Sequence, residues 1–124
     1  MARKILIIDD EDDIREVAAL SLESIAGWQV IVSSSGAEGI ARAAEQRPDA
    51  ILLDVMMPGM DGPATFRELR KNPATAHIPV LLLTAKVQGA DKRMFADLGV
   101  DAVLLKPFDP LTLSTQIAGV LGWS

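Results

Sequence analysis

Five short aliphatic runs recur along the chain, and a longer segment with a different pattern follows each of them. The runs occupy residues 4–9, 29–33, 49–54, 78–84 and 101–106. Their hydrophobicity is continuous rather than alternating, which is typical of parallel strands that are covered by helices on both faces. The pattern therefore predicts five buried, parallel strands.

The segments after the runs carry apolar residues three or four positions apart, as one face of an amphipathic helix does. In the first segment these positions are Ile14, Val17, Ala18, Leu22 and Ile25. Local signals agree with helices, because Asp61 is suited to cap the third, Gly99 to end the fourth and Pro110 to start the fifth. The chain is thus predicted to repeat a strand-helix unit five times.

Repeated strand-helix units define an α/β fold. Because crossovers between parallel strands are right-handed, the sheet is expected to be doubly wound, with helices on both faces. Five strands with one reversal favour the flavodoxin-like order 2-1-3-4-5. At 124 residues, the whole range 1–124 is predicted to form a single domain.

Composition excludes several classes of function. The net charge of −5 argues against direct nucleic-acid binding, which needs a basic surface. The absence of cysteine excludes disulfides, thiolate metal sites and cysteine nucleophiles. No apolar run approaches the ~18 residues of a membrane span, so we expect a cytoplasmic protein with no membrane contact.

Polar residues end four of the predicted strands: Asp9 and Asp10, Asp54, Thr84, and Lys106. Each alone has a structural explanation, such as a solvated helix start, a turn or a helix cap. Together they are harder to explain in that way, because parallel strands deliver their carboxyl ends to one edge. Ligands of such sheets bind at this edge, where the strand order reverses.

The predicted cluster needs a cation. Two carboxylates ~4 Å apart repel by about 1 kcal/mol in water and about 4 kcal/mol at an effective dielectric of 20. Oxygen ligands alone favour Mg²⁺. Lys106 suits a phosphoryl group, and Thr84 adds a hydroxyl donor. Asp54, which stands alone at its strand end, is predicted to attack phosphorus, while the pair Asp9 and Asp10 suits the metal.

The same residues lie in recognisable motifs: "DD" at 9–10, "LLDVMMPGMDG" around Asp54, "LLLTA" around Thr84 and "LLKPF" around Lys106. From Lys4 to Leu121 the chain resembles the receiver domain of two-component response regulators, in its stand-alone form. The resemblance implies that Asp54 accepts a phosphoryl group from the phosphohistidine of a sensor histidine kinase or phosphotransfer protein.

The resemblance also implies the remaining site and the output. Magnesium is bound by Asp9, Asp10, Asp54 and the backbone carbonyl of Met56. Thr84 and Lys106 contact the phosphoryl group, and the Lys106-Pro107 peptide is cis. Such a domain is not an enzyme with an external substrate, because it catalyses only its own phosphorylation and dephosphorylation. Its output is expected through the face of the fourth helix, fifth strand and fifth helix, which binds a downstream protein target.

Two features differ from, or sharpen, the family pattern. Val103 stands where receiver domains often carry an aromatic residue, so the usual coupling of that ring to the threonine is not expected. Met56 and Lys86 occupy positions that help to set the dephosphorylation rate in the family. Because a thioether cannot orient an attacking water, we expect no fast self-hydrolysis.

Three other functions are alternatives for this fold class. A haloacid-dehalogenase-like phosphatase also forms an aspartyl phosphate, but it needs a second aspartate two residues after its nucleophile, where Asp9 is followed by Glu11. A flavodoxin needs a hydroxyl-rich phosphate loop after its first strand, and five acids stand there instead. A receiver-like interaction domain that does not use phosphate is the third alternative.

Overall fold

The computed structural model describes residues 3–85 and 89–123, and this part contains one parallel sheet of five strands. The strands are β1 (Lys4–Ile8), β2 (Gln29–Ser33), β3 (Ala50–Asp54), β4 (Val80–Thr84) and β5 (Ala102–Leu105). They lie in the order β2-β1-β3-β4-β5, so the predicted α/β flavodoxin-like fold is confirmed.

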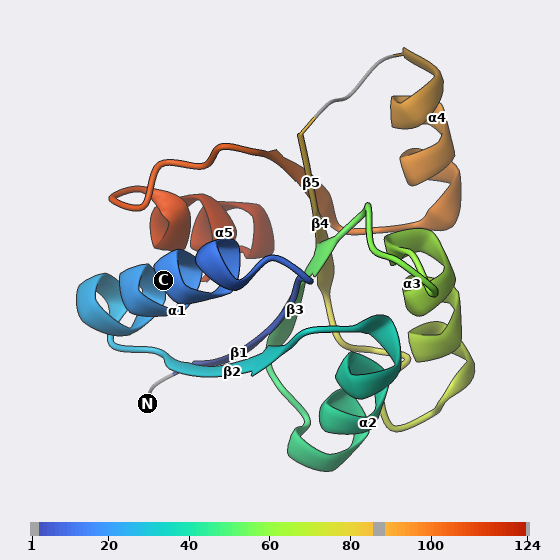
Figure 1. Cartoon of the computed structure of the whole chain (residues 1–124), viewed down its shortest axis with the longest axis horizontal. Coiled ribbons are helices and arrows are strands. Elements are labelled where there is room, and N and C mark those ends of the chain that lie inside the picture. Colours follow the sequence, from blue (N-terminus) through green and yellow to red (C-terminus); the bar gives the residue numbers. More distant parts are fainter. Residues whose placement is uncertain (1–2, 86–88, 124) are drawn as a thin grey trace.

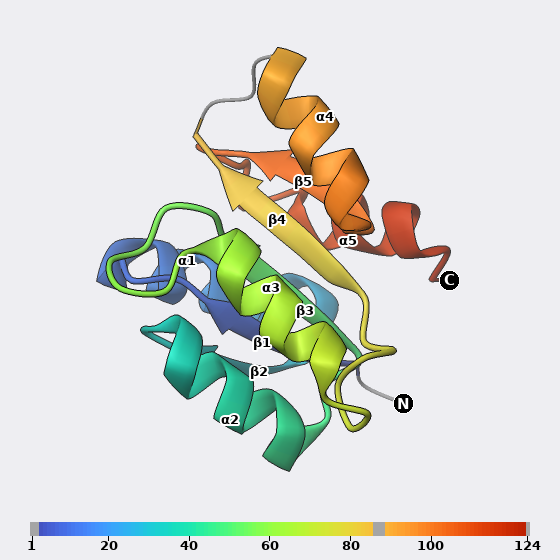
Figure 2. The ribbon, with the colours of Figure 1, turned by 90° about the vertical axis from the view of Figure 1, so that its right-hand side faces the viewer.

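Helices cover both faces of the sheet. They are α1 (Asp12–Ala26), α2 (Gly36–Gln46), α3 (Gly62–Lys71), α4 (Gly89–Leu98) and α5 (Leu113–Leu121). Helices α1 and α5 lie on one side, and α2, α3 and α4 lie on the other (Figure 1). Figure 2 looks onto the second side, with α3 in front of the middle of the sheet.

The two helical layers enclose two separate apolar cores. Successive residues of a strand point to opposite faces, so Leu6 and Ile8 pack toward α2 and α3 while Ile5 and Ile7 pack toward α1 and α5. All four are buried. This two-sided burial explains why the strands read as continuous aliphatic runs rather than as alternating ones.

The predicted helix signals are largely confirmed. The Asp61 carboxylate accepts a hydrogen bond of 2.9 Å from the backbone N–H of Ala64 and so caps α3. Gly99 follows α4 with a φ of +85°, a left-handed conformation that favours glycine. Pro110 is a correction, because it lies in a turn and α5 begins at Leu113.

Helix α1 buries most of the predicted face, but not all of it. Ala18 and Leu22 are buried, and Ile14 packs against the same core. Val17 and Ile25 are 41% and 50% exposed, whereas Ser21 is buried. The reason is tertiary: the Ser21 hydroxyl donates to the carbonyl of Pro110, so the turn before α5 lies against this polar position of α1. A periodicity rule that counts only apolar residues cannot find that contact.

Strand β4 begins two residues later than predicted. Ile78 is buried in the core, but the next residue, Pro79, has no N–H to donate to a sheet ladder. Its carbonyl still accepts a bond of 2.9 Å from Ile51. The apolar run therefore starts as buried loop and becomes a strand at Val80.

Aromatic side chains join the two ends of the described chain. The rings of Trp28 and Trp123 meet edge to face with centroids 5.4 Å apart, and the Arg3 guanidinium lies 4.4 Å from the Trp123 ring. Trp28 directly precedes β2, so this contact lies at the amino ends of the strands. Among the described helices none is both long and apolar enough to cross a membrane.

Candidate functional site

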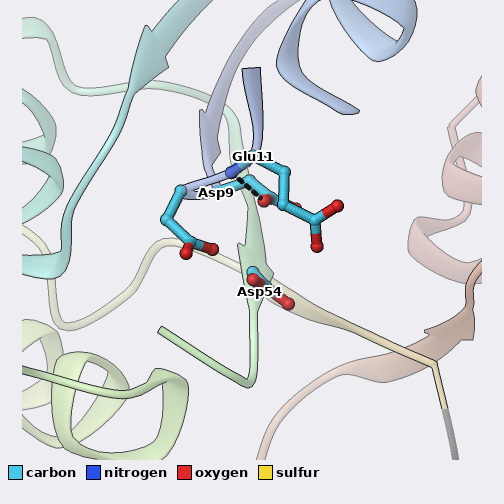
Figure 3. Close-up of side chains that lie close together, drawn as sticks. Asp9, Glu11 and Asp54 are labelled. Atoms are coloured by element: carbon cyan, nitrogen blue, oxygen red, sulfur yellow. Dashed lines mark hydrogen bonds between the residues drawn. The ribbon is translucent and has the colours of Figure 1, made fainter. Parts of the chain in front are cut away.

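The carboxyl ends of β1 and β3 bring two aspartates together. The strands pair in register, with Ile8 opposite Leu53, so the next residues, Asp9 and Asp54, lie side by side. Asp9 is fully buried and Asp54 is 3% exposed. Figure 3 shows the Asp9 and Asp54 side chains close together at this end of the sheet. The predicted convergence at the reversal of strand order is therefore observed.

Lys106, which follows the edge strand β5, contacts both aspartates. Its Nζ lies 3.0 Å from Asp9 Oδ2 and 3.1 Å from Asp54 Oδ1. Its backbone N–H donates to the Thr84 carbonyl, at 2.8 Å, which fixes the start of the side chain beside β4. The Lys106-Pro107 peptide is cis, as the resemblance implied.

Glu11 is a member of the cluster that the sequence did not single out. Its carboxylate lies 3.4 Å from Lys106 Nζ, and its N–H donates to Asp9 Oδ1 at 2.9 Å (Figure 3). An aspartate that accepts a bond from the N–H two residues later forms a local turn. That i, i+2 spacing was the available signal, but the run of five acids from Asp9 to Asp13 hid it.

The other predicted site residues lie around this cluster. Thr84, the last residue of β4, is 5% exposed, and Asp10 is exposed at the rim. The Met56 side chain, in the loop after β3, is 78% exposed. Its backbone carbonyl stays a predicted ligand. Lys86, predicted to affect dephosphorylation, lies outside the described residues.

A glycine holds the loop after β3 against the site. The Gly62 N–H donates to the Val55 carbonyl at 2.9 Å. A Cβ at position 62 would lie 2.5 Å from the carbonyl oxygen of Asp54 and 2.8 Å from the Val55 Cα, distances that no real Cβ tolerates. The first turn of α3 therefore packs directly on the backbone that carries Asp54.

Burial and charge shift the titration of this cluster. Burial, and then the neighbouring Asp9 carboxylate, raise the pKa of Asp54 from 3.8 to about 6, although Lys106 opposes the shift. Burial acts to lower the pKa of Lys106, but its contacts with Asp9 and then Asp54 outweigh burial and raise it. The Lys106 ammonium therefore stays charged, while the Asp54 carboxyl group is half-ionised just below neutral pH.

The cluster offers a buried carboxylate oxygen without a partner. Asp54 Oδ2 has no hydrogen-bond partner among the described residues, whereas Asp9 Oδ2 is held by Lys106 in an ion pair of 3.0 Å. Asp9, Asp10, Glu11 and Asp54 can each present one oxygen within 4.8 Å of the others. An all-oxygen donor set with an unsatisfied buried carboxylate fits a hard divalent cation.

The fold and this site define a doubly wound α/β domain with an acidic cluster at the carboxyl edge of its sheet, and comparison with known proteins identifies the family. The chain matches the response regulator receiver domain over residues 5–118 and belongs to that family. Receiver domains are signalling domains of two-component systems. The family match favours this class over the phosphatase and flavodoxin alternatives.

Three relatives illustrate the match. The alkaline phosphatase synthesis transcriptional regulatory protein PhoP of Bacillus subtilis is 37% identical over 121 residues, which cover 98% of this chain and 49% of PhoP. The chain thus spans about half the length of this regulator. The structure of the chemotaxis protein CheY4 of Vibrio cholerae superimposes with a TM-score of 0.90 at 32% identity, covering 97% of this chain and 99% of CheY4.

The third relative bears on the metal. The receiver domain of the sensor histidine kinase PA1611 of Pseudomonas aeruginosa has a TM-score of 0.86 at 29% identity, over 98% of this chain and 99% of that domain. That structure holds a magnesium ion in its active-site cleft.

Proposed function

We propose that this receiver domain takes a phosphoryl group onto Asp54 from the phosphohistidine of a sensor histidine kinase or phosphotransfer protein. One observation carries the proposal: Lys106 Nζ bridges Asp9 and Asp54, and the second oxygen of Asp54 is buried without a partner in the part of the chain that the structure describes. A nucleophilic carboxylate needs a free oxygen and a fixed positive charge beside the position where phosphoryl charge develops.

The residues divide the work. An Asp54 oxygen forms a bond to phosphorus as the bond from phosphorus to the donor nitrogen breaks, which leaves an acyl phosphate on the chain. The Lys106 ammonium, released from part of its contact with Asp54, pairs with the phosphoryl oxygens. The Thr84 hydroxyl donates to another of these oxygens. Each group lies at the same edge of the sheet, so little rearrangement is needed.

Asp9, Asp10, Asp54 and the Met56 carbonyl are proposed to hold Mg²⁺. Asp54 Oδ2, which has no partner among the described residues, and the purely oxygen donor set support this ligand set. When bound, the ion supplies positive charge that offsets the phosphoryl oxygens during transfer. The exposed position of Asp10 suits a ligand that acts through a water molecule.

The proposed output surface is the face of α4, β5 and α5. A hollow of about 340 Å³ lies between α4 and β5, and its lining includes Phe95, Val103 and Leu105 with Lys92 at the edge. Leu105 is 58% exposed. With Val103 in place of an aromatic ring, a change at Thr84 would reach this surface through the backbone between β4 and α4. A downstream protein target, rather than nucleic acid, fits the acidic chain.

The test is intact mass spectrometry after incubation with acetyl phosphate and magnesium. The wild-type chain should gain one phosphoryl group, and Asp54→Asn should gain none. Asp49→Asn is a matched control, because this exposed aspartate precedes β3 at the opposite end of the same strand. A magnesium-free sample should stay unmodified. An adduct on Asp54→Asn, or none on the wild type under any magnesium concentration, would contradict the proposal.

A further inference from the structure

A groove lies between α3 and α4, two helices on the side of the sheet that faces the viewer in Figure 2. Its inner part, about 550 Å³, reaches the site and is lined by Met56, Thr84 and Phe95 among others. Its outer part, about 610 Å³, is lined by Arg67, Arg93, Met94, Asp97 and Leu98. Arg67 and Met94 line both parts, so the groove is continuous.

Helix α4 is anchored to the domain by few side chains. Of the described α4 side chains only Phe95 is buried, and Leu98 packs partly buried against the same core on the α2 and α3 side of the sheet. Met94, the residue before Phe95, is 40% exposed and lines the groove toward α3. Met94 and Leu98 therefore give the groove an accessible apolar part between its charged residues.

Two cationic side chains, Arg67 on α3 and Arg93 on α4, line the groove from its two sides. Most described lysines and arginines have a partner: Arg15, Arg42, Arg70, Lys71 and Lys106 in ion pairs, Lys4 on a carbonyl and Arg3 on a ring. Arg67 on α3 and Arg93 on α4 make no hydrogen bond, ion pair or ring contact among the described residues. Both arginines thus line one hollow with their charge unpaired among the described residues, in a chain of net charge −5.

The acids of the groove do not neutralise them. Asp61 is engaged in capping α3, and Asp91 has an interaction of its own. Asp97 forms no ion pair with Arg93, although it follows by one helical turn. The positive charge of the groove therefore lies at Arg67 and Arg93. The negative charge of Asp97 lies one helical turn further along α4.

We propose that the α3-α4 groove binds a segment of a partner protein in which an acidic side chain stands next to a large apolar one. The acidic group pairs with Arg67 and Arg93, whose forked guanidinium groups suit a carboxylate, and the apolar group packs on Met94 and Leu98. This surface is on the opposite flank of α4 from the proposed output face, and it needs no phosphorylation of Asp54.

A flat nucleobase fits less well. The described lining offers no exposed aromatic ring for stacking, because Phe95 is 3% exposed. Asp97 would also repel a polyphosphate, whereas a peptide can direct its acidic group away from it. The mixed lining therefore favours a peptide segment.

The test uses two synthetic helical peptides of about 15 residues. One carries glutamate and leucine on a single face, and its charge-reversed counterpart carries lysine for each glutamate. Each is titrated into the isotope-labelled full chain without phosphodonor, and backbone amide shifts are followed by NMR. The acidic peptide should shift amides of α3 and α4, and the basic peptide should not.

Charge reversal locates the contact. Arg67→Glu with Arg93→Glu should weaken binding of the acidic peptide at least about tenfold. Lys92→Glu is the matched control, since Lys92 is also exposed on α4 and has no partner in the described part of the chain, but lines the hollow toward β5. It should leave binding within about twofold. All three sites are exposed, so unchanged thermal unfolding of each variant checks the fold.

Several results would overturn the proposal. The acidic peptide could fail to bind, or the basic peptide could bind as well. Lys92→Glu could weaken binding as much as the double variant Arg67→Glu with Arg93→Glu, which would move the contact to the α4-β5 side. A parallel titration with ATP completes the test: shifts at Arg67 and Arg93 with ATP but not with the acidic peptide would define a small-anion site instead.

Discussion

Lys106 Nζ lies 3.1 Å from Asp54 Oδ1, although 52 residues separate them and β4 lies between their strands. The lysine also contacts Asp9, and its side chain is only 11% exposed. One ammonium therefore balances two buried carboxylates in the resting domain. Any change that removes the ammonium, or adds another cation, alters both the stability and the chemistry of the site.

Lys106→Met should destabilise the metal-free domain at pH 8 by about 3 kcal/mol, because Asp9 and Asp54 are left buried without a cation. Magnesium should restore part of the loss by supplying the missing charge. Urea unfolding with and without magnesium measures both effects. Lys92→Met is the control, since this exposed lysine has no partner among the described residues, and it should change the free energy of unfolding by less than about 0.5 kcal/mol. Equal losses in the two variants would contradict the role of Lys106.

The raised pKa of Asp54 predicts a pH dependence. Between about pH 4 and about pH 6, folded Asp54 keeps a proton that the unfolded chain has released. Its contribution to the free energy of unfolding therefore falls as pH rises through this window, by up to about 3 kcal/mol, and is constant above it. The difference between wild type and Asp54→Asn in urea unfolding from pH 4 to pH 8 isolates this contribution. A flat difference would mean that the Asp54 pKa is not raised.

The same ionisation should control the metal. Magnesium binding needs the carboxylate form, so the apparent affinity should rise up to about pH 6 and then level off. Calorimetric titration with magnesium at several pH values measures this profile. A profile that still rises above pH 7 would show that Asp54 is not the limiting group.

Gly62→Ala should disturb the phosphoacceptor through its backbone. The new Cβ would lie 2.5 Å from the Asp54 carbonyl oxygen, so β3 or α3 must shift, at a cost of about 1–3 kcal/mol. The rate of phosphorylation by acetyl phosphate should fall as well. Gly119→Ala is the matched control: it lies in α5 with nothing within 4 Å of the added atom, and it should stabilise by about 0.5–1 kcal/mol.

Val103→Phe should be accepted by the fold. Val103 lines the hollow of about 340 Å³ between α4 and β5, which can take the larger side chain. The expected change in the free energy of unfolding is below about 1 kcal/mol. Leu82→Phe, at a fully buried position of β4, should cost about 1–3 kcal/mol. Thermal unfolding of the two variants makes the comparison, and similar losses would show that the hollow does not accept the ring.

The Met56 side chain predicts a long-lived phosphorylated form. It is 78% exposed next to Asp54, and its thioether offers no strong hydrogen bond to an attacking water. Met56→Asn should shorten the half-life of the adduct, followed by mass spectrometry after removal of donor. A wild-type half-life of seconds would contradict this prediction.

The sequence predicted the fold because uninterrupted aliphatic runs mark the buried β-strands. Ile5 to Ile8 are all buried, and no polar residue interrupts them. It also placed Asp9, Asp54 and Lys106 together, because parallel strands bring their carboxyl ends to one edge whatever the sequence distance. These inferences rest on topology and need no side-chain detail.

The parts that were missed depend on contacts between distant segments. Glu11 was one acid among five, and only its distance to Lys106 distinguishes it from Asp12 and Asp13. The buried face of α1 includes Ser21 because of the carbonyl of Pro110, which lies 89 residues away in the chain. The weak anchoring of α4 also has no local signal, since its apolar residues are regularly spaced.

The contact between Trp28 and Trp123 has a practical consequence. These are the only two tryptophans of the chain, and they lie at the amino ends of the strands, whereas Asp54 ends a strand of five residues, ~17 Å long. Intrinsic fluorescence will thus report the contact between Trp28 and Trp123 and its loss on unfolding. It will be nearly silent to an ion or a phosphoryl group at Asp54, so a titration followed by tryptophan emission can appear blank while the site fills.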